Sequence, residues 1–114
     1  TRKEYSMKNL NSILLEGAVV SEPLFQSGSD TKVPRLRFLL DIDPTVPPIP
    51  VTISGKLAIT SQPRLHTGSA IRVVGRIGVD NFAEAIASIV ILPEHIEFKP
   101  QLQTLPLEET ADAF

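Results

Sequence analysis

Alternating apolar and polar positions are the main pattern in the chain, and they predict β-strands. The clearest case runs from Arg35 to Ile42, where Arg35, Arg37 and Asp41 alternate with apolar residues. The apolar residues that share one face are Leu36, Phe38, Leu40 and Ile42. A period of two is typical of a strand with one buried face, so we expect Phe38 in a hydrophobic core.

Similar signals predict a strand in four further segments: 11–20, 51–54, 70–77 and 87–98. Gly17 and Gly75 lie inside two of them, and an internal glycine marks a bulge or a sharp bend. Pro93 in the last segment predicts a bulge or an edge position. We expect a turn or loop at 21–33, a proline-rich connector at 43–50 and a hairpin loop at 78–84.

One helical element is expected between the third and fourth strands. Lys56–Thr60 can form a single turn, and Pro63 limits its extension. Five strands with one short helical element match the five-stranded OB-fold barrel, an all-β fold. A sandwich of the immunoglobulin type needs about seven strands, which is more than this chain offers.

The chain of 114 residues fits one domain. We expect an N-terminal extension at 1–9, the OB-fold domain at 10–99 and a flexible acidic C-terminal tail at 100–114. Because the chain begins with Thr1, either its start is trimmed or Met7 is the natural start. No apolar run approaches the roughly 20 residues that cross a bilayer, and no signal peptide is visible, so we expect a cytoplasmic protein.

Composition limits the chemistry. The chain has no cysteine, which excludes disulfides and thiolate metal sites, and its two histidines lack further ligands at a workable spacing. No nucleophile motif and no phosphate-binding loop is present. We therefore expect no enzyme activity, no metal and no cofactor. The net charge is −2, but residues 1–107 carry 11 basic and 10 acidic residues, so the acidity is concentrated in the tail.

Five short motifs follow one another over residues 11–98. Their sequences are Asn11–Val19 with Glu22-Pro23, Arg37–Leu40, Ser54–Ala58, Gly68–Ile77 and Pro93–Phe98. In this order they resemble the motifs of bacterial single-stranded DNA-binding proteins. The resemblance implies an OB-fold that binds single-stranded DNA with little sequence preference, in replication, recombination or repair near the nucleoid. It also implies a homo-oligomer, either a dimer or a tetramer.

The resemblance implies a DNA-binding surface and a docking tail. The residues expected to contact DNA are Lys32, Arg35, Arg37, Lys56, Arg72, Arg76 and Phe82. Basic groups would follow the phosphates and Phe82 would stack on a base. The alternative for the charged residues is an ordinary solvated strand face. The tail residues expected to dock replication or repair proteins are Glu108, Glu109, Asp112 and Phe114; the alternative is a simple solvated terminus.

Departures from the family pattern keep a second function open. The chain has no tryptophan, and Ser54 and Pro48 stand where the family has aromatic residues. The basic hairpin between the second and third strands is reduced to the proline-rich connector. The end of the third strand, with a serine before Gly55, also resembles the corresponding segment of a primosomal accessory protein of the same fold. The alternative function is therefore an OB-fold protein–protein interaction module with weak or lost DNA binding.

Overall fold

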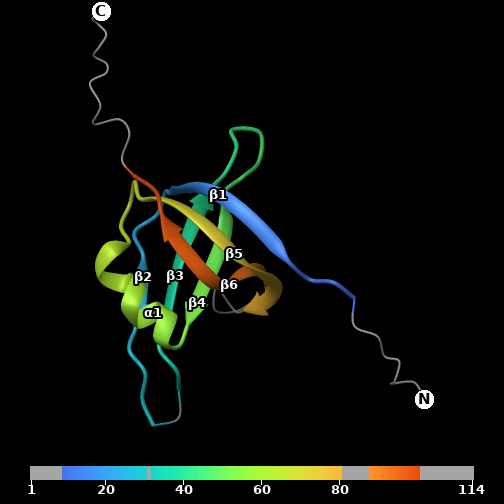
Figure 1. The fold of residues 1–114 in the computed structure, drawn as a ribbon. Helices are drawn as coiled ribbons and strands as arrows, with labels where there is room; N and C mark the ends of the chain where they lie inside the picture. Colours follow the sequence, from blue (N-terminus) through green and yellow to red (C-terminus); the bar gives the residue numbers. More distant parts are fainter. Residues whose placement is uncertain (1–8, 31, 81–87, 101–114) are drawn as a thin grey trace, which may run out of the picture.

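The computed structural model describes residues 9–30, 32–80 and 88–100. These residues form a closed, mixed β-barrel with one short α-helix (Figure 1). In chain order, the elements are β1 Ile13–Val19, β2 Leu24–Gln26, β3 Arg35–Asp41, β4 Ile49–Ser54, α1 Lys56–Ser61, the 3₁₀ helix η1 Gln62–Arg64, β5 Ala70–Asp80 and β6 Ser88–Phe98.

The strand order is β1-β5-β6-β4-β3-β2, and an additional β1–β3 pairing closes the barrel. Five strands therefore form the barrel, and β2 extends the β3 side as a short outer strand. β4 and β6 run parallel, whereas the other pairs are antiparallel. The α-helix connects β4 to β5, which is the position expected between the third and fourth barrel strands. This is the OB-fold topology that the sequence predicts.

The core lies inside the barrel, and the alternation in β3 is confirmed. Leu36, Phe38 and Leu40 are buried. Across the β3–β4 pair, Phe38 lies opposite Val51 and Leu36 lies opposite Ile53, and both β4 residues are also buried. Because cross-strand partners point to the same side of a sheet, these residues line the barrel interior together.

Gly17 marks the corner at which β1 turns from one neighbouring strand to another. Most of β1 pairs with β5, but Ala18 pairs both with Ala70 of β5 and with Asp41 of β3. A Cβ atom at Gly17 would collide with the backbone carbonyl of Asp41. Glycine is therefore required at this corner because the backbones of β1 and β3 approach too closely for a side chain.

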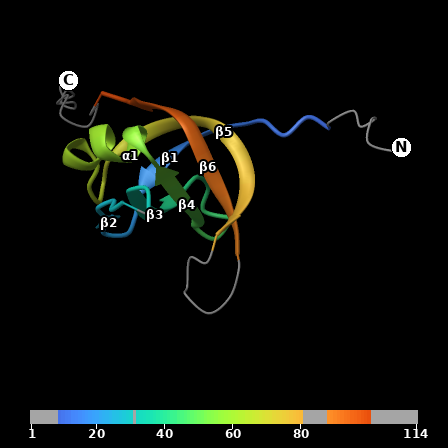
Figure 2. The ribbon, with the colours of Figure 1, turned by 90° about the horizontal axis from the view of Figure 1, so that it is seen from below.

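The bulge predicted near Pro93 is confirmed. Gly75 pairs with Pro93 and Val74 pairs with His95, so Glu94 of β6 has no register partner on β5. One extra residue on one strand increases the local bend. Figure 2 shows that β5 and β6 curve together around one side of the barrel.

Three predicted boundaries were wrong. Leu24–Gln26, predicted as part of a loop, forms β2; all three residues are exposed, so no burial pattern marks them. β4 begins at Ile49, before Val51, and includes Pro50 opposite Leu39. β5 continues through Gly78 to Asp80, where a hairpin loop was predicted. Of that predicted loop, residues 81–84 lie outside the described part of the chain.

The helical turn is confirmed at Lys56–Ser61, and Pro63 follows its end within η1. The early positions of a helix tolerate proline because their N–H groups have no helical partner. In the described residues, no helix has the length and apolar character that crossing a membrane requires.

Candidate nucleic-acid interface

The outer face of β3 and β4 carries two of the arginines predicted to bind DNA. Arg35 and Arg37 alternate with the buried core residues of β3, so their side chains leave the barrel on the outside. Arg35 lies opposite Ser54 and Arg37 lies opposite Thr52. OB barrels bind oligonucleotides on the face of their second and third barrel strands, which here are β3 and β4.

Asp80, the last residue of β5, binds both arginines. Its Oδ1 lies 3.2 Å from the Nη1 of Arg35, which donates a hydrogen bond to it. Its Oδ2 lies 3.2 Å from the Nε of Arg37 and accepts a 2.8 Å hydrogen bond from the hydroxyl of Thr52. We call Arg35, Arg37, Thr52 and Asp80 the Asp80 cluster. It joins the end of the β5–β6 hairpin to the outer face of β3 and β4.

The Asp80 cluster is partly shielded from water. The side chains of Asp80 and Arg37 are only 10% and 18% exposed, whereas that of Arg35 is 42% exposed. The Nε of Arg37 is buried and makes no hydrogen bond to any residue that the structure describes, although it lies within ion-pair distance of Asp80. A buried N–H group without an acceptor is unfavourable. The cluster therefore holds more donor capacity than the Asp80 carboxylate satisfies.

Arg72 belongs to a separate network on β1, β5 and β6. Its Nε donates a 2.7 Å hydrogen bond to Glu16, and its Nη1 donates a 3.0 Å hydrogen bond to Glu97. Lys99 donates a 3.2 Å hydrogen bond to the other oxygen of Glu16. The hydrogen bond from Arg72, followed by that from Lys99, lowers the pKa of Glu16, and the pKa of Arg72 is raised in return.

The remaining predicted cations differ in their surroundings. Arg76 lies 3.6 Å from Glu94, and both side chains are mostly exposed. Lys56 is exposed at the start of α1, next to the Ser54–Arg35 end of the sheet. Lys32 is exposed in the turn before β3. Among the described residues, neither lysine forms an ion pair with a carboxylate.

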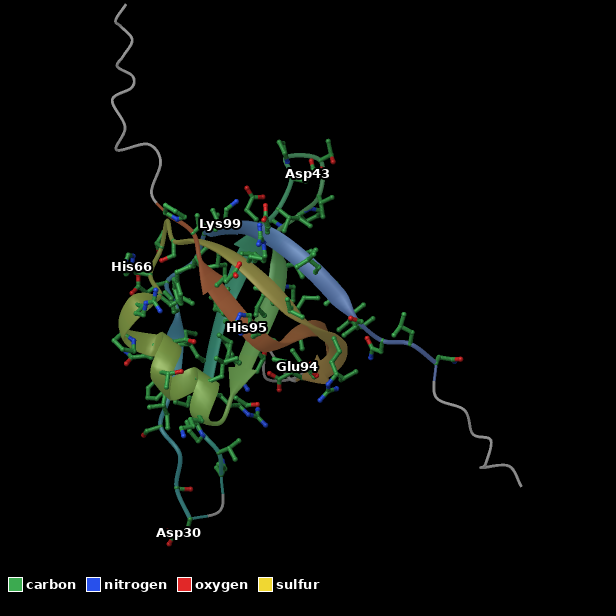
Figure 3. The ribbon with its side chains drawn as sticks, in the orientation of Figure 1. Asp30, Asp43, His66, Glu94, His95 and Lys99 are labelled. Carbon is green, nitrogen blue, oxygen red and sulfur yellow. The ribbon has the colours of Figure 1, made fainter. Side chains whose placement is uncertain are left out.

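The two loops that flank β3 mark the two ends of the barrel. Asp30 lies at the tip of the loop between β2 and β3, and Asp43 lies in the loop between β3 and β4, at the opposite end (Figure 3). Arg35 begins β3 and is therefore at the Asp30 end, as is Lys32. Asp43 accepts hydrogen bonds from the backbone N–H and the hydroxyl of Thr45, which lower its pKa.

The aromatic residues that the structure describes give this face little stacking surface. Phe38 is in the core, as predicted, and Phe98 packs against the Arg64 guanidinium at 4.0 Å from its ring centre. Phe25 is partly exposed, but it pairs with Leu36 and so lies on the inner side of the sheet. Phe82 lies outside the described residues, as do the tail residues Glu108, Glu109, Asp112 and Phe114.

No group of three or more metal-binding side chains gathers in the described part of the chain, and no pocket is found there either. The arrangement consists instead of exposed strand faces that carry ionic groups. Exposed faces with ionic groups can bind an extended, charged chain.

Sequence reasoning missed Asp80 and Thr52. Asp80 was assigned to a loop, and Thr52 was not considered as a functional residue. A signal was present, because the period of two in β5 continues beyond the predicted end of the strand through Gly78 to Asp80. This alternation places Asp80 on the same side of β5 as Arg72 and Arg76. Its arginine partners could not be inferred, since they lie 45 and 43 positions earlier in the chain.

Comparisons with known proteins support the fold. No protein-family profile matches the sequence, and no curated protein matches it either. The SSB domain of a Synechococcus sp. protein matches with a TM-score of 0.65 and 16% identity, over 80% of this chain and 98% of that domain.

Two further solved structures are similar. The single-stranded DNA-binding protein of Thermus aquaticus matches with a TM-score of 0.67 and 18% identity, over 81% of this chain and 41% of that protein. The second single-stranded DNA-binding protein of Mycobacterium smegmatis matches with a TM-score of 0.65 and 16% identity, over 79% of this chain and 87% of that protein. The chain thus has the OB fold, and its barrel is similar to the domains of bacterial single-stranded DNA-binding proteins.

Proposed function

We propose that this protein binds single-stranded DNA through the outer face of β3 and β4, with little sequence preference and without a catalytic step. The observation that carries the proposal is the group of cations at one end of this face. Arg35 and Arg37 lie on β3, and Lys56 follows the end of β4. Basic groups along an OB-fold face bind a nucleic-acid strand mainly through its phosphates.

The similar solved structures add support, because they belong to single-stranded DNA-binding proteins with the same fold. We place Lys32 at the edge of the same surface, since it precedes β3 at the Arg35 end. Arg72 and Arg76 contribute less in this proposal, because they lie on β5 and not on the outer face of β3 and β4. Phe82 supplies base stacking, as the sequence resemblance implies.

The proposal extends to assembly and to cellular role. A weakly basic surface gains affinity when several copies act together, so we infer a dimer or tetramer. The role would be in replication, recombination or repair, in the cytoplasm near the nucleoid. The acidic tail that ends at Phe114 would dock partner proteins of those processes.

Fluorescence anisotropy with labelled oligo-dT tests the proposed binding. The protein is titrated at two salt concentrations, and oligo-dC and oligo-dA of the same length are compared. We expect binding to weaken as the salt concentration increases, because the release of salt counterions from the DNA phosphates favours binding. The three oligonucleotides should bind similarly. Absence of binding to oligo-dT at low salt would contradict the proposal.

One observation favours the alternative function, a protein–protein interaction module. All four arginines predicted to bind DNA are within ion-pair distance of a carboxylate: Arg35, Arg37, Arg72 and Arg76. Paired cations attract phosphate less than free ones do. If oligo-dT does not bind, we expect the protein to act through contacts with other proteins instead.

A further inference from the structure

The Asp80 cluster has the donor set of a phosphate site. Two guanidinium groups and one hydroxyl converge on a single carboxylate. Arginine side chains bind phosphate and carboxylate by the same geometry, because both anions present oxygen atoms to the guanidinium donors. The donors that bind the Asp80 carboxylate are therefore of the kind that also bind phosphate.

The cluster also retains unused capacity for an anion. Two guanidinium groups and one carboxylate leave one positive charge among these three side chains. The buried Nε of Arg37 makes no hydrogen bond to Asp80. A phosphodiester of DNA carries one negative charge and two non-bridging oxygens, as a carboxylate does, so its oxygens can bind the same guanidinium donors.

Asp80 reaches the cluster from the last position of β5, next to apolar residues of the described part of the hairpin that are themselves exposed. The pair before it, Val79 and Ile89, is 67% and 70% exposed. Val79 and Ile89 therefore bury little apolar surface at this part of the hairpin. Instead, the Asp80 carboxylate connects β5 to β3 and β4 through its polar contacts with Arg35, Arg37 and Thr52.

We propose that Arg35, Arg37 and Thr52 form a phosphate subsite that Asp80 occupies as an internal competitor, and that single-stranded DNA binds there by displacing the Asp80 carboxylate. This inference rests on the proposed function and adds an autoinhibitory contact to it. Asp80 limits the affinity for DNA because a bound phosphate must break its ion pairs and lie near its negative charge.

The main test is Asp80→Asn, measured by anisotropy with labelled oligo-dT. Asn can still accept the Thr52 hydrogen bond but carries no charge. The matched control is Asp43→Asn, which removes one acid at the other end of β3 (Figure 3). We expect Asp80→Asn to tighten binding about tenfold and Asp43→Asn to change it less than about twofold. Adding Arg37→Gln to Asp80→Asn should abolish the gain.

A second measurement separates the subsite from DNA binding. Thermal unfolding of each variant is followed with and without inorganic pyrophosphate. We expect pyrophosphate to raise the Tm of Asp80→Asn more than that of the wild type or Asp43→Asn, because a ligand of the folded state stabilises it. The effect should disappear in the Asp80→Asn, Arg37→Gln double variant.

The outcomes are distinguishable. If the wild type binds oligo-dT and Asp80→Asn gains no more than Asp43→Asn, the inference is wrong and the proposed function stands. If no variant binds oligo-dT but pyrophosphate stabilises Asp80→Asn selectively, the subsite stands and the proposed function is wrong. If neither ligand binds any variant, both are wrong.

If a variant does not fold, the displacement of Asp80 can be tested in the wild-type protein instead. Its arginine Nε–H signals are observed by NMR while oligo-dT is added. If DNA displaces Asp80, the Arg37 signal should shift as DNA saturates the protein, because a phosphate replaces the Asp80 carboxylate beside the Arg37 guanidinium. An unchanged Arg37 signal at saturation would overturn the inference.

Discussion

Glu16 of β1 and Arg72 of β5 face each other across the β1–β5 pair, and a 2.7 Å hydrogen bond joins Arg72 Nε to Glu16 Oε2. Lys99 and Glu97 complete the network around them. The network connects three strands on the outside of the barrel. The hydrogen bond from Arg72 stabilises the ionised form of Glu16 and so lowers its pKa below the ordinary value of 4.5.

This shift predicts a pH dependence of stability. Because the pKa of Glu16 is lower in the folded state, the unfolded state takes up a proton first as the pH falls below 4.5. The contribution of Glu16 is thus complete above that pH and is lost as the pH falls through the folded pKa. We expect wild type and Glu16→Gln, compared by urea unfolding, to differ most near neutral pH and to converge in acid.

Glu22→Gln is the control for this experiment, since Glu22 is an exposed carboxylate outside the network. Near neutral pH, Glu22→Gln should change the free energy of unfolding less than Glu16→Gln does, because it breaks no part of the network. A difference between wild type and Glu16→Gln that stays constant from neutral pH to pH about 3 would contradict the prediction.

Lys56 and Arg72 should respond differently in DNA binding. Lys56 is exposed and forms no ion pair with another described residue, whereas Arg72 is bound by two carboxylates. We expect Lys56→Gln to weaken oligo-dT binding and to reduce the salt slope, log K against log salt, by about 0.7. Arg72→Gln should leave the slope nearly unchanged. Equal salt slopes for the two variants would contradict the prediction that Lys56 contacts a DNA phosphate and Arg72 does not.

Phe82→Ala tests base stacking. Phe82 lies outside the described residues, so this prediction rests on the sequence resemblance. We expect a loss of about 1–3 kcal/mol in the free energy of oligo-dT binding, measured by anisotropy. Phe25→Ala is the matched control, because Phe25 is partly exposed but lies on the inner side of the sheet at β2. If the two variants lose affinity equally, Phe82 has no specific stacking role.

Gly75→Ala should destabilise the fold. A Cβ atom at Gly75 would lie 2.8 Å from the Cα of Pro93 and would also collide with the backbone carbonyl of Leu92. Backbone atoms cannot move aside as a flexible side chain can, so we expect a loss of about 1–3 kcal/mol in the free energy of unfolding. The neighbouring exposed position provides a control: Val74→Ala should cost less. Urea unfolding of both variants measures the difference.

The barrel could be predicted largely because burial follows the period of two. The alternation around Phe38 identified β3 and its buried face, and the glycines at 17 and 75 marked places where backbones approach closely. β2 could not be identified in this way, because Leu24–Gln26 is short and exposed on all three residues. Its position depends on pairing with β3, which no local pattern encodes.

The candidate site was harder to predict than the fold. Arg35 and Arg37 could be assigned to the outer face because they alternate with core residues. Their pairing with Asp80 could not be predicted, because it depends on how far the β5–β6 hairpin curves around the barrel. That curvature arises from the bulge at Gly75 and Pro93. Local sequence therefore predicted which residues face outward, whereas tertiary structure determined which charges meet.

The closure of the barrel by β1 has a consequence for the order of folding. Glu16 and Arg72 are 56 positions apart in the chain, yet they are direct neighbours in the β1–β5 pair. During synthesis, β1 leaves the ribosome well before β5 exists, so most of its backbone groups must wait for a partner. Pairings across such distances have a large loop-closure entropy and make β-barrels slow to fold, over milliseconds to seconds. Although β1 is made before β5, it is therefore among the last strands of the barrel to be fully paired.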